Sequence, residues 1–452
     1  MHGLNASGRS PAAWTPDHFA RYESMPSLGW DAVTVPGAVS AWVALSEQFG
    51  KLPFERLFES GIHYAENGFP VGPKSAYFFA LAKQRFAGYE AFNTNLPAGR
   101  ASTRTGDTLR LPDRRPHACP HCRDARRSVL SRRELAEAIA ADAAAAGGAM
   151  TVDDLASHSA DWVQPISQAF QHARLHEIPP SGQGLMALIA LGIVEQLGPG
   201  NAPLDSADSV HCQIEAFRIA WAEAERHIAD IDHMTIAPES LLDPDYLARR
   251  AAEVDPAARI PRRSHSARAP TPSTCRTADA DGMMVSLIQS NYRGFGSGIV
   301  VPGTGISLQN RGSGFTLEEG HPNQVGSRKR PFHTIIPGLA TVDGKPSMSF
   351  GVMGGHMQAQ GHLQMMIRVY LHGQNPQAAS DAPRWHLTED GSVCLEDGFD
   401  TDVANELAAR GHDVRLGNPE HLFGGAQLIY RLENGTYCAG SDHRKEGHAA
   451  GF

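Results

Sequence analysis

The sequence predicts a layered α/β protein of the mixed α+β kind, because long helix-forming segments alternate with short strand-forming ones. The helical segments are rich in Ala, Leu and Glu and stop at glycines, whereas the strand segments are short, partly alternating and bounded by glycine. Of the 452 residues, 41% are apolar and 20% are charged, which is ordinary for a globular protein with one large core or two. We therefore expect helices packed against sheets.

Three segments carry the helix pattern. Glu134–Ala146 consists of strong helix formers and is followed by two glycines, which stop a helix well. Ser206 is a suitable N-cap for a second helix, in which apolar residues recur at helical spacing as far as Ala224. Thr401–Arg410, closed by a glycine, predicts a helix on the surface.

Two segments carry the strand pattern. Met284–Ser290 and Ser347–Met353 are short, partly alternating runs between glycines, as is typical of strands near the core of a sheet.

Charge and hydropathy exclude several classes of function. The formal net charge of -9 is spread along the chain, which argues against a nucleic-acid partner. No run of eighteen apolar residues occurs, so we expect no membrane span. The first residues lack a basic region followed by an apolar core, so we expect a cytoplasmic protein. We also expect no cofactor and no resident metal.

Ser286–Arg311 closely resembles the front of the catalytic half of the gamma-glutamyltranspeptidases. Further blocks match this family in the right order, so that the resemblance covers most of residues 35–95, 134–245 and 277–452. The blocks are Val35–Trp42, Phe49–Phe54, Ala65–Val71, Glu177–Gly184, Lys329–Pro331, Gly351–Gly355 and Ala382–Trp385.

The resemblance implies an N-terminal nucleophile hydrolase fold, a four-layer αββα sandwich of two antiparallel sheets. These enzymes cut their own chain before a threonine, whose hydroxyl then attacks an amide with help from its new α-amine. Residues 1–270 would be a mostly helical large-subunit-like region and residues 271–452 the small-subunit-like catalytic region. The block Leu4–Pro11 resembles one that relatives carry after further elements, so we expect an N-terminally truncated chain.

The implied activity is hydrolysis or acyl transfer of a small-molecule amide, such as glutathione or another gamma-glutamyl compound. The implied partners are that substrate and, after self-cleavage, the chain's own two fragments.

Two segments, about 114–132 and 255–276, depart from the family pattern and are rich in Arg, Pro, His and Cys. Arg127–Arg132 is what codons for a family-like Gly-Glu-Ala-Phe-Tyr-Arg-Gly give when they are read one base out of frame. A possible set of codons for Pro270–Cys275, read in a shifted frame, likewise encodes Asp-Thr-Val-Tyr-Leu, which resembles the nucleophile strand of the family. We hypothesise two short frameshifted segments, with genuine divergence as the alternative. The nucleotide sequence decides between them.

The nucleophile position is altered in this chain. Counting back from Asp281, it falls on Pro272, which has no hydroxyl. Thr271, Ser273 and Thr274 are candidates for a displaced nucleophile, although each is alternatively an ordinary loop hydroxyl. The other alternative is a catalytically inactive, unprocessed family member.

Three more residues match catalytic positions of the family. Gly354 and Gly355 correspond to the glycines whose N–H groups hold the developing oxyanion, because a residue without Cβ lets the backbone approach closely. Taken alone, the pair would indicate only a tight strand-to-helix turn. Ser290 corresponds to a hydroxyl that supports the nucleophile, and alone it would be a structural serine.

The substrate-binding candidates are Asn310, Arg311, His333 and Thr334. Arg311 stands where well-known members hold the α-amino group of glutamate. A cation there cannot attract an ammonium and would instead meet a carboxylate or a carbonyl. His333 and Thr334 stand where those members have two serines.

His356 and His362 resemble a bacterial branch of the family whose substrates need not be gamma-glutamyl compounds. Their alternative interpretation is a polar helix face, either solvated or hydrogen-bonded.

One motif indicates a different function. His117–Cys122 contains a Cys-x-x-Cys with two histidines, a set of ligands that suits zinc, and would make the chain a metal-binding module. Four ligands within six residues would be cramped, however, and no second cysteine pair follows. Cys212, Cys394 and Cys438 are scattered and are expected to be reduced thiols.

Overall fold

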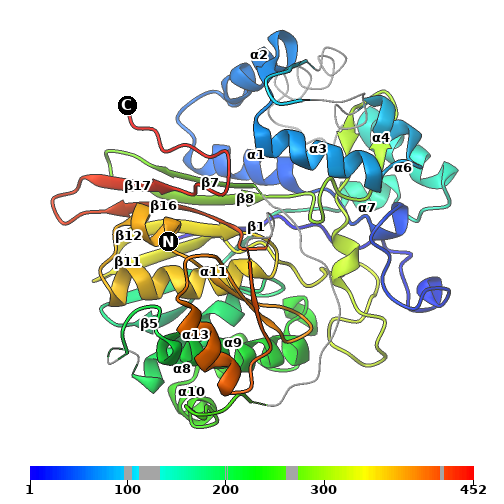
Figure 1. Ribbon diagram of the computed structural model, residues 1–452. Coiled ribbons are helices and arrows are strands. Elements are labelled where there is room, and N and C mark those ends of the chain that lie inside the picture. Colours follow the sequence, from blue (N-terminus) through cyan, green and yellow to red (C-terminus); the bar gives the residue numbers. More distant parts are fainter. Residues whose placement is uncertain (96–103, 111–132, 199, 201, 261–272, 418–421) are drawn as a thin grey trace. The chain divides into compact units, whose positions relative to one another are not determined.

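The computed structural model describes residues 1–95, 104–110, 133–198, 200, 202–260, 273–417 and 422–452 (Figure 1). The chain forms two compact units. Unit 1 comprises Met1–Gly3, Gln164–Ser290 and Phe332–Phe452, and unit 2 comprises Leu4–Val163 and Asn291–Pro331.

A six-stranded antiparallel sheet forms the centre of unit 1, in the order β17-β16-β12-β11-β6-β5. Inward-facing residues alternate with outward-facing ones, as the pleat requires, so that β6 buries every second residue. The strands are β5 (Ile166–Phe170), β6 (Ala173–Glu177), β11 (Gly338–Val342), β12 (Lys345–Met353), β16 (Gly425–Arg431) and β17 (Tyr437–Ser441).

A hairpin of β7 (Ser273–Ala278) and β8 (Met284–Gln289) packs on one face of this sheet, against β12 and β16. Ser349 Oγ on β12 donates a hydrogen bond to the Val285 carbonyl at 2.8 Å, and Ser286 Oγ on β8 donates to the Phe350 carbonyl at 3.3 Å. The two layers are therefore joined by side-chain hydrogen bonds as well as by packing.

Helices cover the other face of the six-stranded sheet (Figure 1). α8 (Gly184–Leu197) is almost entirely apolar and buried, and it lies against α9 (Ala207–His227), α10 (Pro244–Ala251) and α11 (Met357–Met366). Leu188, Phe217 and Phe350 are fully buried in the core that these elements share. The remaining elements of unit 1 are α12 (Pro376–Asp381), α13 (Thr401–Ala409), β13 (Trp385–Leu387), β14 (Val393–Leu395) and β15 (Val414–Leu416).

Unit 2 is mainly helical. Its short strands include the antiparallel pairs β2 (Phe69–Pro70) with β3 (Thr108–Leu109) and β9 (Val300–Val301) with β10 (Ile306–Ser307). Trp14, packed edge-on against Phe19 and Phe315, anchors one of its apolar clusters. Its other elements are α1 (Ala38–Phe49), α2 (Glu59–Asn67), α3 (Pro73–Arg85), α4 (Glu90–Asn95), α6 (Arg133–Ala145), α7 (Val152–Ala156), β1 (Gly3–Asn5) and β4 (Asp161–Val163).

The elements expected from local pattern are confirmed. The Ala-rich helix is α6, the helix capped by Ser206 is α9, and the surface helix is α13. The Ser206 side chain accepts from the Ser209 N–H, as an N-cap should. The two expected strands are β8 and β12. The division at residue 270 concerns chain cleavage and stays a prediction.

No helix in the described part of the chain is both long and apolar enough to cross a membrane.

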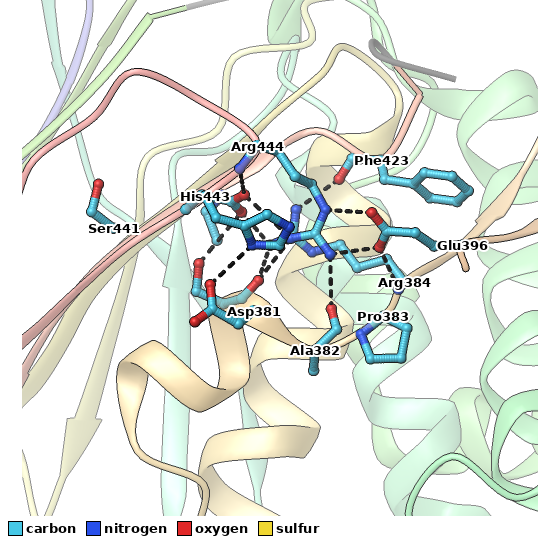
Figure 2. Close-up of polar contacts among 12 residues, drawn as sticks. Asp381, Ala382, Pro383, Arg384, Glu396, Phe423, Ser441, His443 and Arg444 are labelled. Atoms are coloured by element: carbon cyan, nitrogen blue, oxygen red, sulfur yellow. Dashed lines mark hydrogen bonds and ion pairs between the residues drawn. The ribbon is translucent and has the colours of Figure 1, made fainter. Parts of the chain in front are cut away.

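Three buried charged side chains and the partly buried Arg444 tie the last residues of unit 1 to its middle (Figure 2). Arg384 donates to Asp442 at 2.5 Å, and Arg444 binds both oxygens of Glu396, each at 2.5 Å. Arg384 also donates to the Phe423 carbonyl, while Asp442 accepts from the Ala426 N–H at 2.6 Å. The network therefore fixes the start of β16 as well as the end of the chain.

Burial alone would raise the pKa of the Asp442 carboxyl, but Arg384 and Arg444 lower the pKa to about 2, against an ordinary value of 3.8. A carboxyl whose pKa is lowered on folding stabilises the protein above the unfolded-state pKa and loses this effect as the pH falls toward the folded-state pKa.

We expect Asp442→Asn to lower the free energy of unfolding at pH 7 by about 3–5 kcal/mol, because it leaves Arg384 as a buried charge without its partner. Between pH 5 and pH 2 the original chain should lose about 2 kcal/mol more than the variant does. Urea unfolding at several pH values measures both effects. Asp413→Asn, at an exposed pair with Arg415, is the control and should change little. Equal pH dependence in the original chain and in Asp442→Asn would contradict the prediction.

Candidate active site

Gly354 and Gly355 form the turn between β12 and α11, and both are buried. Their φ angles of 128° and 63° lie where only glycine is comfortable. A Cβ on Gly354 would also lie 3.1 Å from the Gly424 Cα. Among the hydrogen bonds of the described residues, neither glycine N–H has an acceptor. Both N–H groups are thus available for a developing oxyanion.

Gln183 joins this turn to two other segments. Its buried Nε2 donates to the Gly355 carbonyl at 2.7 Å and to the Thr334 carbonyl at 2.8 Å. The Gln183 N–H donates to the His333 carbonyl, and the His333 N–H donates to the Ser181 carbonyl, both at 2.9 Å. Gln183 belongs to the matching block Glu177–Gly184, but the sequence predicts no role for it, because its only signal is a lone amide in a glycine-rich loop.

His333 and Thr334 are therefore brought beside the glycine pair. Both are buried, and His333 Nδ1 accepts from the Ile335 N–H at 3.1 Å. Their role in binding substrate stays a prediction.

Two of the three candidate nucleophiles, Ser273 and Thr274, lie at one end of the β7–β8 hairpin. Thr271 and Pro272 lie outside the described residues. Ser273 is the first residue of β7 and pairs with Gln289, and Ser290 directly follows β8. Thr274 is half-buried, and its Oγ1 has no hydrogen-bond partner within the described residues. Which hydroxyl acts, if any of them does, stays a prediction.

Arg276 on β7 points its guanidinium between the two sheets. A Cβ on Gly351 of β12 would lie 1.6 Å from Arg276 Nη2, so the guanidinium covers that glycine directly. Nη1 donates to the Cys275 and Leu287 carbonyls, but Nε and Nη2 are buried without a partner among the described residues. Burial lowers the pKa of Arg276 to about 9. Arg276, with these unpartnered nitrogen atoms, belongs to the segment of about 255–276 that departs from the family pattern. The poor fit of its side chain favours the hypothesis of an altered reading frame there.

Asn310 and Arg311 belong to unit 2. The Asn310 side chain donates to the Ser27 carbonyl at 2.8 Å and accepts from the Arg293 N–H at 3.0 Å. The Arg311 guanidinium lies 4.5 Å from the centre of the Tyr292 ring. Burial lowers the pKa of Arg311 to about 9, so the side chain is still a cation at pH 7. The role of both residues in binding substrate stays a prediction.

His362 is hydrogen-bonded, as its alternative interpretation allows, but it is fully buried and not solvated. Its Nδ1 lies 2.6 Å from Glu177 Oε1. The reason is that α11 packs against both β12 and α8, which leaves this side of the helix no solvent. His356 stacks against Trp221 and Phe332, with ring centres 5.3 Å and 5.8 Å away.

The possible zinc motif, His117–Cys122, lies outside the described residues. Within the described ranges, no group of three or more His, Cys, Asp or Glu side chains could hold a metal ion. Cys212, Cys394 and Cys438 are free thiols in the described part of the chain, as is the exposed Cys275.

We expect Arg276→Leu to raise the free energy of unfolding by about 1–3 kcal/mol, because it removes a buried charge and its unpaired N–H groups while filling the same space. Urea unfolding at pH 7 measures the change. Arg384→Leu is the matched control: Arg384 is also buried but binds Asp442, so this variant should be less stable than the original chain. A lower free energy of unfolding in Arg276→Leu would contradict the prediction, because it would show that the contacts of the guanidinium stabilise the fold.

Comparisons with known proteins agree with this geometry. The gamma-glutamyltranspeptidase family model matches residues 1–452. The oxamate amidohydrolase proenzyme of Klebsiella pneumoniae is 34% identical, covering 99% of this chain and 87% of that protein. The glutathione hydrolase-like YwrD proenzyme of Bacillus subtilis is 31% identical, covering 99% and 86%. The crystal structure of cephalosporin acylase from Bacillus halodurans has a TM-score of 0.91 at 40% identity, covering 99% of this chain and 84% of that one. With its sheets, its glycine pair and these relatives, the chain belongs to the gamma-glutamyltranspeptidase family and has the N-terminal nucleophile hydrolase fold.

Proposed function

We propose that this chain is built to cleave an amide bond and transfer its acyl group to water or to an amine, after cutting itself near residues 271–274. The observation that carries the proposal is the pair of buried N–H groups at Gly354 and Gly355, which lack acceptors within the described residues. They lie where β12 ends, in the same unit as the hydroxyl-bearing hairpin. The names of the relatives, a glutathione hydrolase-like protein, an amidohydrolase and an acylase, support amide chemistry.

In this proposal a hydroxyl at the new N-terminus gives its proton to the neighbouring α-amine and attacks the amide carbonyl carbon. The carbonyl oxygen becomes an oxyanion, which the two glycine N–H groups stabilise. Collapse of this intermediate breaks the C–N bond, and the leaving amine takes the proton from the α-ammonium group. Water or a second amine then attacks the acyl ester and restores the hydroxyl. Ser290 would support the nucleophile.

Arg311 bears on the substrate class. A buried cation repels the ammonium group of a gamma-glutamyl donor and attracts a carboxylate or a carbonyl. We therefore propose an acyl group that carries a carboxylate without an ammonium group beside it. Oxamate, named in one relative, is an amide of this kind.

The second candidate function is that of an inactive, uncleaved family member. Pro272 at the counted nucleophile position favours it, because a proline has neither a hydroxyl nor a primary amine to offer. Self-cleavage separates the two candidates.

Intact-mass analysis of the purified chain, 48.6 kDa before any cleavage, tests the proposal. We expect Pro272→Thr to split before residue 272 and to hydrolyse an amide, because it restores the missing hydroxyl. If the unaltered chain also splits, the break will identify Thr271, Ser273 or Thr274 as its nucleophile. A single mass for the unaltered chain would support the second candidate, an inactive family member. A single mass for Pro272→Thr as well would contradict the proposal that the site lacks only its nucleophile.

In the Pro272→Thr background, we expect Arg311→Gln to raise KM for a carboxylate-bearing amide about tenfold or more, because the charge that attracts the carboxylate is gone. Arg311→Lys keeps the charge and should lose less. Initial rates over a range of substrate concentrations separate KM from kcat. An unchanged KM in Arg311→Gln would remove this residue from substrate binding.

A further inference from the structure

Two buried histidines join three segments of unit 1 that lie far apart in the sequence. His211, on α9, has its Nδ1 2.8 Å from Nε2 of His412, which lies between α13 and β15. The other ring nitrogen of His211, Nε2, lies 2.8 Å from the carbonyl oxygen of Asp255, which follows α10. His211 is 1% exposed and His412 is 4% exposed, so both rings are shielded from solvent.

These contacts fix where the protons of the two rings lie. A carbonyl oxygen can only accept, so His211 Nε2 carries a hydrogen and donates it to Asp255. One hydrogen lies between His211 Nδ1 and His412 Nε2, because two N–H groups cannot point at each other across 2.8 Å. The remaining nitrogen, His412 Nδ1, has no hydrogen-bond partner within the described residues. His412 Nδ1 is therefore the atom at which the pair can take a further proton.

The groups around His412 Nδ1 oppose that proton. Glu215 Oε1 lies 3.9 Å away and favours it, but Arg218 Nε already binds this oxygen at 3.0 Å. Burial lowers the pKa of His412 to about 3, against an ordinary value of 6.5, and the basic groups nearby act in the same direction. Those groups are His211, Arg218, Arg259 and Arg410. Two further pairs of charged residues lie beside them, Arg410 with Asp208 and Asp413 with Arg415.

The same cluster holds residues 255–260 against α9. The Ile260 N–H donates to Glu215 Oε2 at 2.7 Å, and the Arg259 N–H donates to the Arg410 carbonyl at 2.8 Å. With the bond from His211 to the Asp255 carbonyl, these contacts tie both ends of the segment. A proton on His412 Nδ1 would attract the Glu215 carboxylate away from Ile260 and would repel the arginines.

We propose that the histidine pair His211–His412 is a pH-sensitive switch. With both rings neutral it holds residues 255–260 in place, and a proton on His412 Nδ1 releases them. In the sequence this segment leads to the counted nucleophile position at 272, so the order of the chain before that position would depend on pH. The switch goes beyond the proposed function, since it needs neither self-cleavage nor turnover.

The direction of the pH effect follows from linkage. The held state has a lowered pKa at His412, so it binds fewer protons than the released state between pH 6.5 and pH 3. The held state is therefore fully stable above about pH 6.5 and is weakened as the pH falls below this value. From these two pKa values, the released fraction at pH 5 should be about thirty times that at pH 7.5.

Hydrogen exchange of the full chain, followed by mass spectrometry at pH 7.5 and pH 5, tests the switch. After correction for the intrinsic effect of pH on exchange, the amides of residues 255–260 should be about thirtyfold less protected at pH 5. β12, in the middle of the six-stranded sheet, should keep its protection. Unchanged protection of residues 255–260, or an equal loss in β12, would overturn the proposal.

His412→Gln separates the switch from other effects of acid. Its carboxamide can still donate to His211 Nδ1 but takes up no proton at pH 5, so residues 255–260 should lose little protection. His443→Gln removes an exposed histidine that pairs with Asp381, and it should behave like the original chain. A thirtyfold loss in His412→Gln would also overturn the proposal. If this variant does not fold, the comparison of residues 255–260 with β12 in the original chain still decides the outcome.

Discussion

The ion pair between Arg384 and Asp442 is the interaction that holds in place the segment packed against the turn of Gly354 and Gly355 in unit 1. Arg384 holds the Phe423 carbonyl and Asp442 holds the Ala426 N–H, so both ends of the segment that contains Gly424 are fixed. A Cβ on Gly424 would lie 2.2 Å from the Met353 carbonyl oxygen, and a Cβ on Gly354 would lie 3.1 Å from the Gly424 Cα, so the two backbone segments pack closely. The ion pair thus connects the end of the chain to the turn of Gly354 and Gly355.

The same unit contains a second arginine with a buried guanidinium, Arg276, which we expect to destabilise the fold. Arg384 binds the Asp442 carboxylate and two carbonyl oxygens, and only its Nε has no partner among the described residues. Arg276 binds carbonyl oxygens alone, and both its Nε and its Nη2 have no partner in the described part of the chain. A buried cation costs less when a hydrogen-bonded carboxylate offsets its charge. We therefore expect Arg276 to weaken β7 and its packing against β12.

The turn of the glycine pair is tied to other segments by hydrogen bonds. Gln183 joins Gly355 to the His333–Thr334 segment, because its Nε2 donates to the Gly355 and Thr334 carbonyls. Backbone N–H donors of the kind found at Gly354 and Gly355 are what amide hydrolases use to stabilise an oxyanion.

Local sequence was enough to predict the helices and strands that have a clear pattern, such as α6, α9 and β12, because periodicity and caps act over a few residues. It was also enough to identify the family, because several short blocks match and they occur in the family's order. Only the tertiary structure decided that Gln183 holds carbonyls 151 and 172 residues away, and that His362 is buried against Glu177, 185 residues away. Contacts of this kind depend on how sheets and helices pack, and neither spacing nor composition encodes which distant partner a polar side chain meets.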